Sequence, residues 1–378
     1  MKPAEPVGRL GDVLLGAVGA CGIDLGGDEQ AEVADARSRL GLPDSRKACV
    51  VLVDGLGWYN LTDCSDRAPF LTGADRLRAL QATFPTTTAT NVTYLGTGRE
   101  GGRTRMLGYT VRGERGGLVN LVSWNGGADP HEWQQIPTVF ERLDRSGRLA
   151  VSVGPWRFAD SGLTRAALRG GEYTPAQSLS ERVDAALREL RDPQVDVVYL
   201  YWGDLDAIGH RNGWRCPEWA EALTILDQEL ARLARMLPPG TLMQVTADHG
   251  MVDVPVADRT DIAADERLHR DVDLVGGEPR AVHLYCRPGS AEEVATRWRD
   301  TLGDLTTVIT RAELIDSGLI GPVSAGVRET VGDVVVIANG THAVVDSRSQ
   351  SESSLALVGM HGALTLAEVT VPLVTVQA

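Results

Sequence analysis

Two apolar runs of this chain end on side chains that can bind a metal ion. The first run ends at Asp54, and the second ends on the adjacent pair Asp248 and His249. A glycine follows in each case, so the chain can turn there and leave these groups pointing at one centre. Asp54 alone is equally well explained as a helix N-cap. Two adjacent donors at the end of a strand instead favour a ligand role.

Donors of the same kind occur in two other segments. Asp206 and His210 follow another apolar run and stand four residues apart, which would place both on one face of a helix. A surface ion pair explains this spacing as well. His361 lies in a Gly-Met-His-Gly turn, and taken alone a turn histidine that binds nothing is the simpler explanation.

Taken together, the six donors indicate a metal centre. They would supply three nitrogen or oxygen ligands to each of two ions and leave positions open for a substrate. This mixed set suits Zn²⁺ best, although Mn²⁺ or iron fits the same donors. The candidate ligands are Asp54, Asp206, His210, Asp248, His249 and His361.

A threonine-rich segment, residues 83–91, offers a nucleophile for such a centre. It precedes a helix predicted for residues 89–95, so one hydroxyl would lie at a helix N-terminus, where N–H groups stabilise a phosphoryl oxygen. A hydroxyl attacks poorly near neutral pH unless a metal or a base activates it. N-capping is the alternative role for these threonines.

The elements that must position these groups form an α/β pattern. Short β-branched runs alternate with longer helical patterns, which is typical of βαβ units around a mostly parallel sheet. The runs are continuously apolar, which predicts strands buried on both faces. The clearest strands are residues 48–53, 149–153, 195–201, 242–246 and 371–376, and the clearest helices are residues 30–40, 178–190 and 217–236.

A change in amino-acid composition divides the chain into two parts. Residues 258–346 are more charged and carry strand and helix patterns of their own, and we expect them to form an inserted cap subdomain. Residues 1–257 and 347–378 would then form the catalytic core. Near the start, Leu10 and the apolar residues after it fall on one helical face, which favours a packed amphipathic helix over a secretion signal.

Composition restricts the partners. The formal charge of −14 and a pI near 5 disfavour a nucleic acid polymer or an anionic membrane surface as partner. A small anionic substrate stays possible because bound cations reverse the local charge. Five scattered cysteines without a C-x-x-C pair are expected to be reduced thiols, and together with the absence of a signal pattern they predict a cytoplasmic protein.

These motifs, in this order, resemble the nucleotide pyrophosphatase/phosphodiesterase family of the alkaline phosphatase superfamily. Phe84-Pro85-Thr86-Thr87-Thr88-Ala89-Thr90-Asn91 looks like the nucleophile segment of that family, and the aspartate and histidine motifs flank it in the same order. The resemblance implies an alkaline-phosphatase-like central sheet with a cap and a nucleophile at Thr88, which also binds one ion. It implies one zinc on Asp206, His210 and His361 and the other on Asp54, Asp248 and His249.

The chain departs from the family at two positions that concern the substrate. Members that cleave nucleotides usually carry an aromatic residue after the nucleophile, where this chain has Ala89. The family also uses a downstream asparagine to bind a phosphoryl oxygen, and the matching stretch here offers Tyr109 instead. The expected substrate-binding residues are Tyr109 and Asn91, with Arg280 and Arg328 reaching in from the cap. Exposed ion pairs explain the two arginines equally well.

The leading hypothesis is a phosphodiesterase or pyrophosphatase that acts on a small phosphoester through a phosphorylated threonine. A phosphomonoesterase, a phosphonate hydrolase and a phosphomutase stay open, because all three can share this metal cradle. A sulfatase is disfavoured because Cys64-Ser65-Asp66-Arg67 lacks the required proline and spacing. An inactive metal-binding scaffold is the alternative that is not an enzyme.

Overall fold

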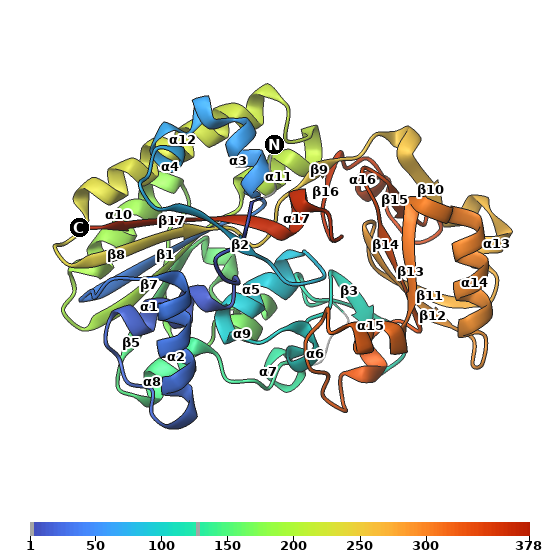
Figure 1. Ribbon diagram of the computed structural model, residues 1–378, viewed down its shortest axis with the longest axis horizontal. Helices are drawn as coiled ribbons and strands as arrows, with labels where there is room; N and C mark the ends of the chain where they lie inside the picture. The colour runs from blue at the N-terminus through green and yellow to red at the C-terminus, as the bar shows by residue number, and fades with distance from the viewer. Residues whose placement is uncertain (1–3, 126–128) are drawn as a thin grey trace.

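The computed structural model describes residues 4–125 and 129–378, and a seven-stranded sheet is its centre (Figure 1). Six strands point the same way, and only β17 runs antiparallel to its neighbours β8 and β2. This confirms the predicted mostly parallel α/β sheet. In spatial order the strands are β2 (Leu77–Gln81), β17 (Thr370–Gln377), β8 (Thr241–Thr246), β1 (Lys47–Val53), β7 (Val195–Trp202), β5 (Leu149–Gly154) and β6 (Glu172–Pro175).

Helices cover both faces of this sheet (Figure 1). One face carries α1 (Asp12–Ala20), α2 (Gly27–Leu40), α5 (Thr88–Thr97), α8 (Val139–Arg145) and α9 (Gly162–Ala167). The other carries α3 (Trp58–Asp63), α4 (Pro69–Thr72), α10 (Leu179–Arg191), α11 (Asp204–Asn212) and α12 (Pro217–Met236). The strands are therefore buried on both sides, as their continuous apolar sequences require.

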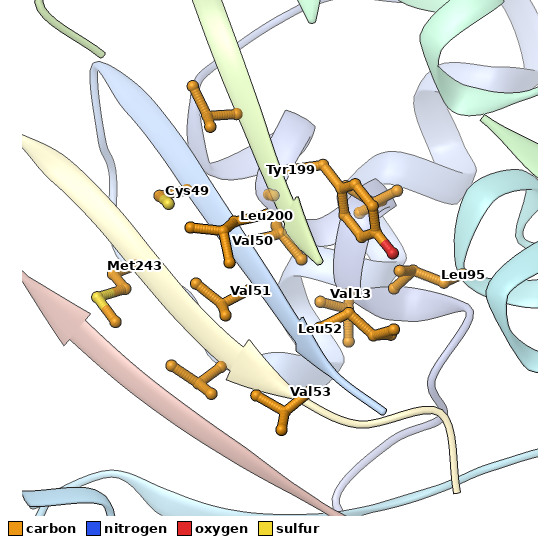
Figure 2. Packing of buried hydrophobic residues seen from close by; sticks show 14 of the residues in the cluster. Val13, Cys49, Val50, Val51, Leu52, Val53, Leu95, Tyr199, Leu200 and Met243 are labelled. Atoms are coloured by element: carbon orange, nitrogen blue, oxygen red, sulfur yellow. The ribbon is translucent and has the colours of Figure 1, made fainter. Parts of the chain in front are cut away.

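The apolar run of β1 lies in the middle of this core. Figure 2 shows Val50 to Val53 beside Leu200 of β7 and Met243 of β8, with Val13 of α1 and Leu95 of α5 packed near them. Each fully buried Val or Leu side chain contributes about 1.5–3 kcal/mol to stability. The helix α1 differs from the prediction, because all of its residues are buried rather than one face of them. The neighbours α2, α5 and β1 enclose it.

A second sheet of four antiparallel strands lies beside the central one, within the predicted inserted range. Its order is β11 (Val272–Glu278), β12 (Ala281–Cys286), β14 (Val334–Ala338) and β13 (Thr306–Thr310). One face packs on α14 (Ala291–Leu302) and α13 (Glu266–His269). The other face packs on residues from outside the predicted cap, among them Leu107 and Val119. The predicted domain boundaries stay a prediction.

Short elements connect the two sheets. The two-stranded pairs are β3 (Thr110–Arg112) with β4 (Leu118–Asn120), β9 (Val252–Asp253) with β16 (Gly359–Met360), and β10 (Arg259–Asp261) with β15 (Ala343–Val345). The short helices are α6 (Gly101–Thr104), α7 (Pro130–Trp133), α15 (Arg311–Ser317), α16 (Glu352–Leu355) and α17 (Leu366–Val369). Among the helices formed by the described residues, none combines the length and apolar character that a membrane span needs.

A buried ion pair joins the cap to the core. Arg280, between β11 and β12, donates from Nε and Nη2 to the two carboxylate oxygens of Glu368 in α17, at 2.9 and 2.6 Å. Both side chains are wholly buried, and Arg280 also donates to the carbonyl of His342. The carboxylate of Glu368 further accepts from the Ala363 backbone N–H. The pair thus ties the cap to the turn that follows His361.

We expect the substitution Glu368→Ala to destabilise the protein by about 3–5 kcal/mol, because it leaves the Arg280 guanidinium buried and uncompensated. Replacing both partners by apolar residues, Arg280→Met with Glu368→Leu, should recover most of this loss. Denaturant unfolding of the variants measures the difference. Arg287→Ala removes an exposed pair with Asp271 and should cost at most about 1 kcal/mol. A similarly small cost for Glu368→Ala would contradict the role assigned to the pair.

Candidate active site

The three candidate aspartates come from adjacent parallel strands. Asp54 follows β1 and Asp248 follows β8, while Asp206 lies in the first turn of α11, which begins just after β7. Val53 pairs with Trp202 and Leu52 pairs with Thr246, so the carboxyl ends of the three strands are level. The strands bring the aspartates to one edge of the sheet, where ligands of open α/β sheets bind.

Close approach of the backbone at this edge depends on Gly55. It adopts φ of +75°, a left-handed conformation that disfavours residues with a side chain. A Cβ atom added there would lie 3.0 Å from Cβ of Asp206. The backbone N–H of Gly55 donates to Oδ1 of Asp248 at 3.1 Å, and the N–H of His249 donates to the same oxygen at 3.0 Å. Glycine at this position therefore lets two strand ends and one helix converge.

The three histidines are held in one tautomer. Nδ1 of His210 lies 2.7 Å from the Gly359 carbonyl, Nδ1 of His361 lies 2.8 Å from the Thr86 carbonyl, and Nδ1 of His249 lies 3.1 Å from the Gly250 carbonyl. A carbonyl only accepts, so each Nδ1 carries the proton and each Nε2 presents a lone pair to the centre. Backbone partners of this kind orient metal-binding histidines.

The Nε2 atoms and carboxylates face one another at short distances. Nε2 of His210 lies 3.3 Å from Nε2 of His361 and 3.3 Å from Oδ2 of Asp206. Nε2 of His249 lies 3.4 Å from Oδ1 of Asp54 and 3.4 Å from Oδ2 of Asp248. Lone pairs opposed at these distances repel unless a cation lies between them.

Two groups of residues could therefore hold a cation. Asp54, Asp248 and His249 form one group, and Asp206, His249 and His361 form the other, with ligand atoms within 4.8 Å of one another in each. His249 belongs to both groups, which the sequence did not suggest. Oδ2 of Asp248 and Oδ1 of Asp206 are buried without a hydrogen-bond donor, as expected of oxygens that bind a cation instead.

Burial and mutual repulsion govern the ionisation of these groups. Burial raises the pKa of Asp54 well above its usual value, and the charges of Asp248 and Asp206 raise it further. Burial and then the charge of Asp206 raise the pKa of Asp248 to about 7. The pKa of His361 is lowered well below its usual value by burial and then by His249 and His210. Bound cations would favour the deprotonated ligands in all of these cases.

The predicted nucleophile lies at this centre. Thr88 is the first residue of α5, and its Oγ1 lies 3.3 Å from Nε2 of His249 and 3.4 Å from Oδ1 of Asp54. The Thr88 side chain is partly exposed, whereas the side chains of the two preceding residues, Thr86 and Thr87, are buried. Of the hydroxyls in the threonine-rich segment, that of Thr88 is the one in contact with both an aspartate and a histidine of the centre.

Two cavities open beside Thr88. One of about 600 Å³ is lined by Thr87, Tyr109, His210 and His361 together with residues of the cap. The other, of about 550 Å³, is lined by Thr88 and by aromatic side chains that include Phe158, Tyr173, Tyr199 and Tyr201. The nucleophile segment thus borders both cavities, one through Thr87 and the other through Thr88.

Of the four predicted substrate-binding residues, only Tyr109 lines one of these two cavities. Tyr109 is 46% exposed and lines the first cavity, and its role in binding substrate stays a prediction. Asn91 is wholly buried, and its amide donates to the carbonyls of Thr83 and Pro85, so it braces the nucleophile loop rather than facing a substrate. Arg280 is buried against Glu368, which contradicts its predicted contact with a substrate. Arg328 is exposed and lines neither cavity.

Two residues of the site were missed by the sequence argument. The Tyr201 hydroxyl donates to Oδ2 of Asp54 at 2.6 Å and so orients that carboxylate. Its place near the end of β7, two residues from Tyr199 on the same face, is a weak signal that could have indicated this role. Glu278 lines the first cavity from the cap, and no local pattern in the sequence marks it.

The chain matches the type I phosphodiesterase/nucleotide pyrophosphatase family over residues 48–364. The chain belongs to this family. The resemblance that its motifs suggest is confirmed, and the protein is a phosphoester-cleaving enzyme by family. The matched range spans all six candidate ligands and Thr88.

Solved structures share its fold. Murine ectonucleotide pyrophosphatase/phosphodiesterase 5 superimposes with a TM-score of 0.71 at 18% identity, covering 88% of each chain. Phosphonoacetate hydrolase from Sinorhizobium meliloti 1021, solved with phosphonoformate, gives a TM-score of 0.69 at 20% identity, covering 89% of this chain and 91% of that one. Both support the alkaline-phosphatase-like architecture.

Curated relatives match a shorter part of the chain. Phosphopentomutase from Sinorhizobium fredii (strain NBRC 101917 / NGR234) is 35% identical over 118 residues, 30% of this chain and 27% of that protein. Phosphopentomutase from Psychromonas ingrahamii (strain DSM 17664 / CCUG 51855 / 37) is 32% identical over the same length. The chain therefore matches about a quarter of the length of these relatives.

We expect metal binding to stabilise the protein more as the pH rises from about 5 to about 7.5. In the metal-free fold the pKa of Asp248 is about 7 against 3.8 for the free side chain, and that of Asp54 is raised too. Folding without metal then takes up protons, so stability falls as the pH rises through this window. Bound cations keep the aspartates deprotonated, so the metal-loaded protein does not lose this stability as the pH rises. The measurement is the melting temperature of chelator-treated protein with and without zinc, and an increment that shrinks with pH would contradict this.

Proposed function

We propose that this chain is a two-metal phosphodiesterase that cleaves a small phosphoester through a phosphorylated Thr88. The observation that carries the proposal is the place of the Thr88 hydroxyl, against His249 and Asp54, on the aromatic cavity and next to Thr87, which lines the other cavity. A diester has a substituent on each side of the phosphorus and needs both cavities, whereas a monoester needs only one.

The residues of the chain would divide the reaction between them. Oγ1 of Thr88 loses its proton and attacks phosphorus in line, while the bond to the leaving oxygen breaks and that oxygen takes up a proton from solvent. Water later releases the phosphoryl group and restores the threonine hydroxyl. The metal ions, when bound, would polarise the phosphoryl oxygens and lower the effective pKa of the Thr88 hydroxyl. Tyr201 fixes the Asp54 carboxylate through its hydrogen bond. Backbone N–H groups at the start of α5 favour negative charge on the phosphoryl oxygens.

We propose zinc as the metal, with Asp206, His210 and His361 on one ion and Asp54, Asp248 and His249 on the other. Nε2 of His210 lies 3.3 Å from Nε2 of His361 and from Oδ2 of Asp206, and Nε2 of His361 lies 3.8 Å from Oδ1 of Asp206, which supports the first set. The second set is one of the two groups with converging ligand atoms. Three ligands per ion leave positions open for Thr88 and the substrate.

The aromatic cavity suits a substituent that carries a flat ring. An inactive variant of murine ectonucleotide pyrophosphatase/phosphodiesterase 5 has been solved with AMP, a ligand that carries such a flat ring. Ala89 is wholly buried in α5 and faces neither cavity, so any stacking on a ring would come from Phe158 or the tyrosines instead. The protein would act in the cytoplasm as a soluble enzyme on such small esters.

An assay of a bis-aryl phosphate against the matching aryl monophosphate, with added zinc, tests the proposal. We expect the diester to be cleaved with the higher kcat/KM. A much higher efficiency on the monoester would favour a phosphomonoesterase. Release of phosphonate-derived phosphate, or transfer of phosphate within a sugar phosphate, would favour the hydrolase or mutase activities of the relatives named above.

We expect the substitution Thr88→Ala to lower kcat by at least about 10³-fold, because the attacking oxygen is lost while the six metal ligands stay. Thr88→Ser should retain measurable turnover. The measurement is steady-state kinetics together with elemental analysis of each variant.

Thr93→Ala is the matched control, because the Thr93 hydroxyl of the same helix donates only to the Ala89 carbonyl. It should stay within a few-fold of wild type. Equal turnover in Thr88→Ala and wild type would disprove the assigned nucleophile, and a metal-loaded wild type without turnover on any phosphoester would favour a scaffold.

A further inference from the structure

Glu278 brings a buried carboxyl group from the cap to the edge of the active site. It is the last residue of β11 and is only 8% exposed. It lines the same cavity as Thr87, Tyr109 and His361. Its Oε2 accepts the backbone N–H of Tyr109 at 2.9 Å, whereas Oε1 is buried without any hydrogen-bond partner. One oxygen is thus anchored by the backbone, whereas the other is a buried oxygen at the edge of the cavity whose hydrogen-bonding capacity is unused.

Backbone geometry places this free oxygen beside the metal-binding turn. Gly362 follows His361 and adopts φ of +132°. A Cβ atom added to Gly362 would lie 2.6 Å from Cγ and 3.1 Å from Oε1 of Glu278, so the absence of a side chain makes room for the carboxyl group. Thr87, on the same cavity, immediately precedes the nucleophile. Glu278 therefore lies between the segment that carries Thr88 and the turn that carries His361.

Among the described residues, no Lys or Arg pairs with this carboxyl group. Burial raises the pKa of Glu278 to about 8, the Tyr109 N–H and the Thr87 side chain lower it only in part, and the charge of Glu368 raises it further. The nearby Arg280 guanidinium is already paired with Glu368. None of the described residues that line this cavity is Lys or Arg. A buried carboxyl group in such surroundings is stable when neutral, and it then carries an O–H that donates.

A phosphoryl group in transfer spreads negative charge over three equatorial oxygens, each of which needs a donor or a cation. We propose that Glu278, in its neutral form, donates a hydrogen bond from Oε1 to a non-bridging phosphoryl oxygen while Thr88 attacks. Glu278 would then be the phosphoryl-binding residue that the cap contributes to the core. This inference rests on the proposed function, because it assumes a phosphoester at Thr88.

Three variants of the metal-loaded enzyme test this role. Glu278→Ala removes the donor and should lower kcat/KM on a bis-aryl phosphate by about 10²-fold, mostly through kcat, as when one donor to a developing charge is lost. Glu278→Gln keeps an N–H donor of nearly the same shape and should stay within about five-fold of wild type. Glu329→Ala, which removes an exposed carboxylate of the same cap region, should change nothing.

Unchanged activity in Glu278→Ala would overturn the proposal. So would a Glu278→Gln variant as slow as Glu278→Ala with full metal content, because a carboxylate would then be required rather than a donor. If wild type itself turns over no diester, the proposed function fails separately. Binding of orthovanadate to the metal-loaded protein then decides, with weaker binding in Glu278→Ala but not in Glu278→Gln as the expected result and equal binding in all three as the contrary one.

Discussion

Three carboxyl groups converge at the buried end of the central sheet, and their mutual repulsion is the constraint that shapes the site. Asp54, Asp206 and Asp248 each end or follow one of three adjacent parallel strands, so the fold cannot separate them. Burial prevents water from screening their charges, which is why the pKa values of Asp54 and Asp248 rise. Divalent cations would relieve this repulsion, and the histidines would complete a coordination shell that the carboxylates begin.

The surroundings of the site make this arrangement rigid. Each histidine is oriented by a backbone carbonyl, and Asp54 is oriented by Tyr201. The turn that carries His361 is fixed to the cap through Glu368 and Arg280. The cap therefore contributes to the geometry of the candidate metal centre, and it also lines the cavity that Thr87 borders. Figure 1 shows α17 and β16 between the two sheets, where this connection is made.

The parts of this account that the sequence predicted are those with local causes. A buried parallel strand is a continuous apolar run, so the central strands could be predicted from the sequence. The helix at residues 217–236 was predicted with its observed bounds. Parallel strands end at one edge, so donors after strands could be expected to meet. The predicted group of six ligands and Thr88 does come together in space, although their assignment to two ions stays a proposal.

The misses come from contacts between distant segments. Arg280 was expected to meet a substrate because its pairing with Glu368, 88 residues away, leaves no local pattern. Asn91 was expected at the substrate, but its Nδ2 donates to carbonyls of the loop before it and its Oδ1 accepts the Thr83 backbone N–H. Glu278 and Tyr201 were missed because their roles depend on which segment of the cap or core packs against them. The helix α1 is buried on every side because of neighbours that its own sequence does not reveal.

Anomalous scattering from a crystal of the zinc-loaded protein would decide whether two ions lie at Thr88. We expect two strong peaks, each about 2.0–2.2 Å from nitrogen or oxygen atoms of three of the six side chains, with Oγ1 of Thr88 next to one of them. A single peak, or peaks away from Thr88, would contradict the claim that this centre activates that hydroxyl with two ions.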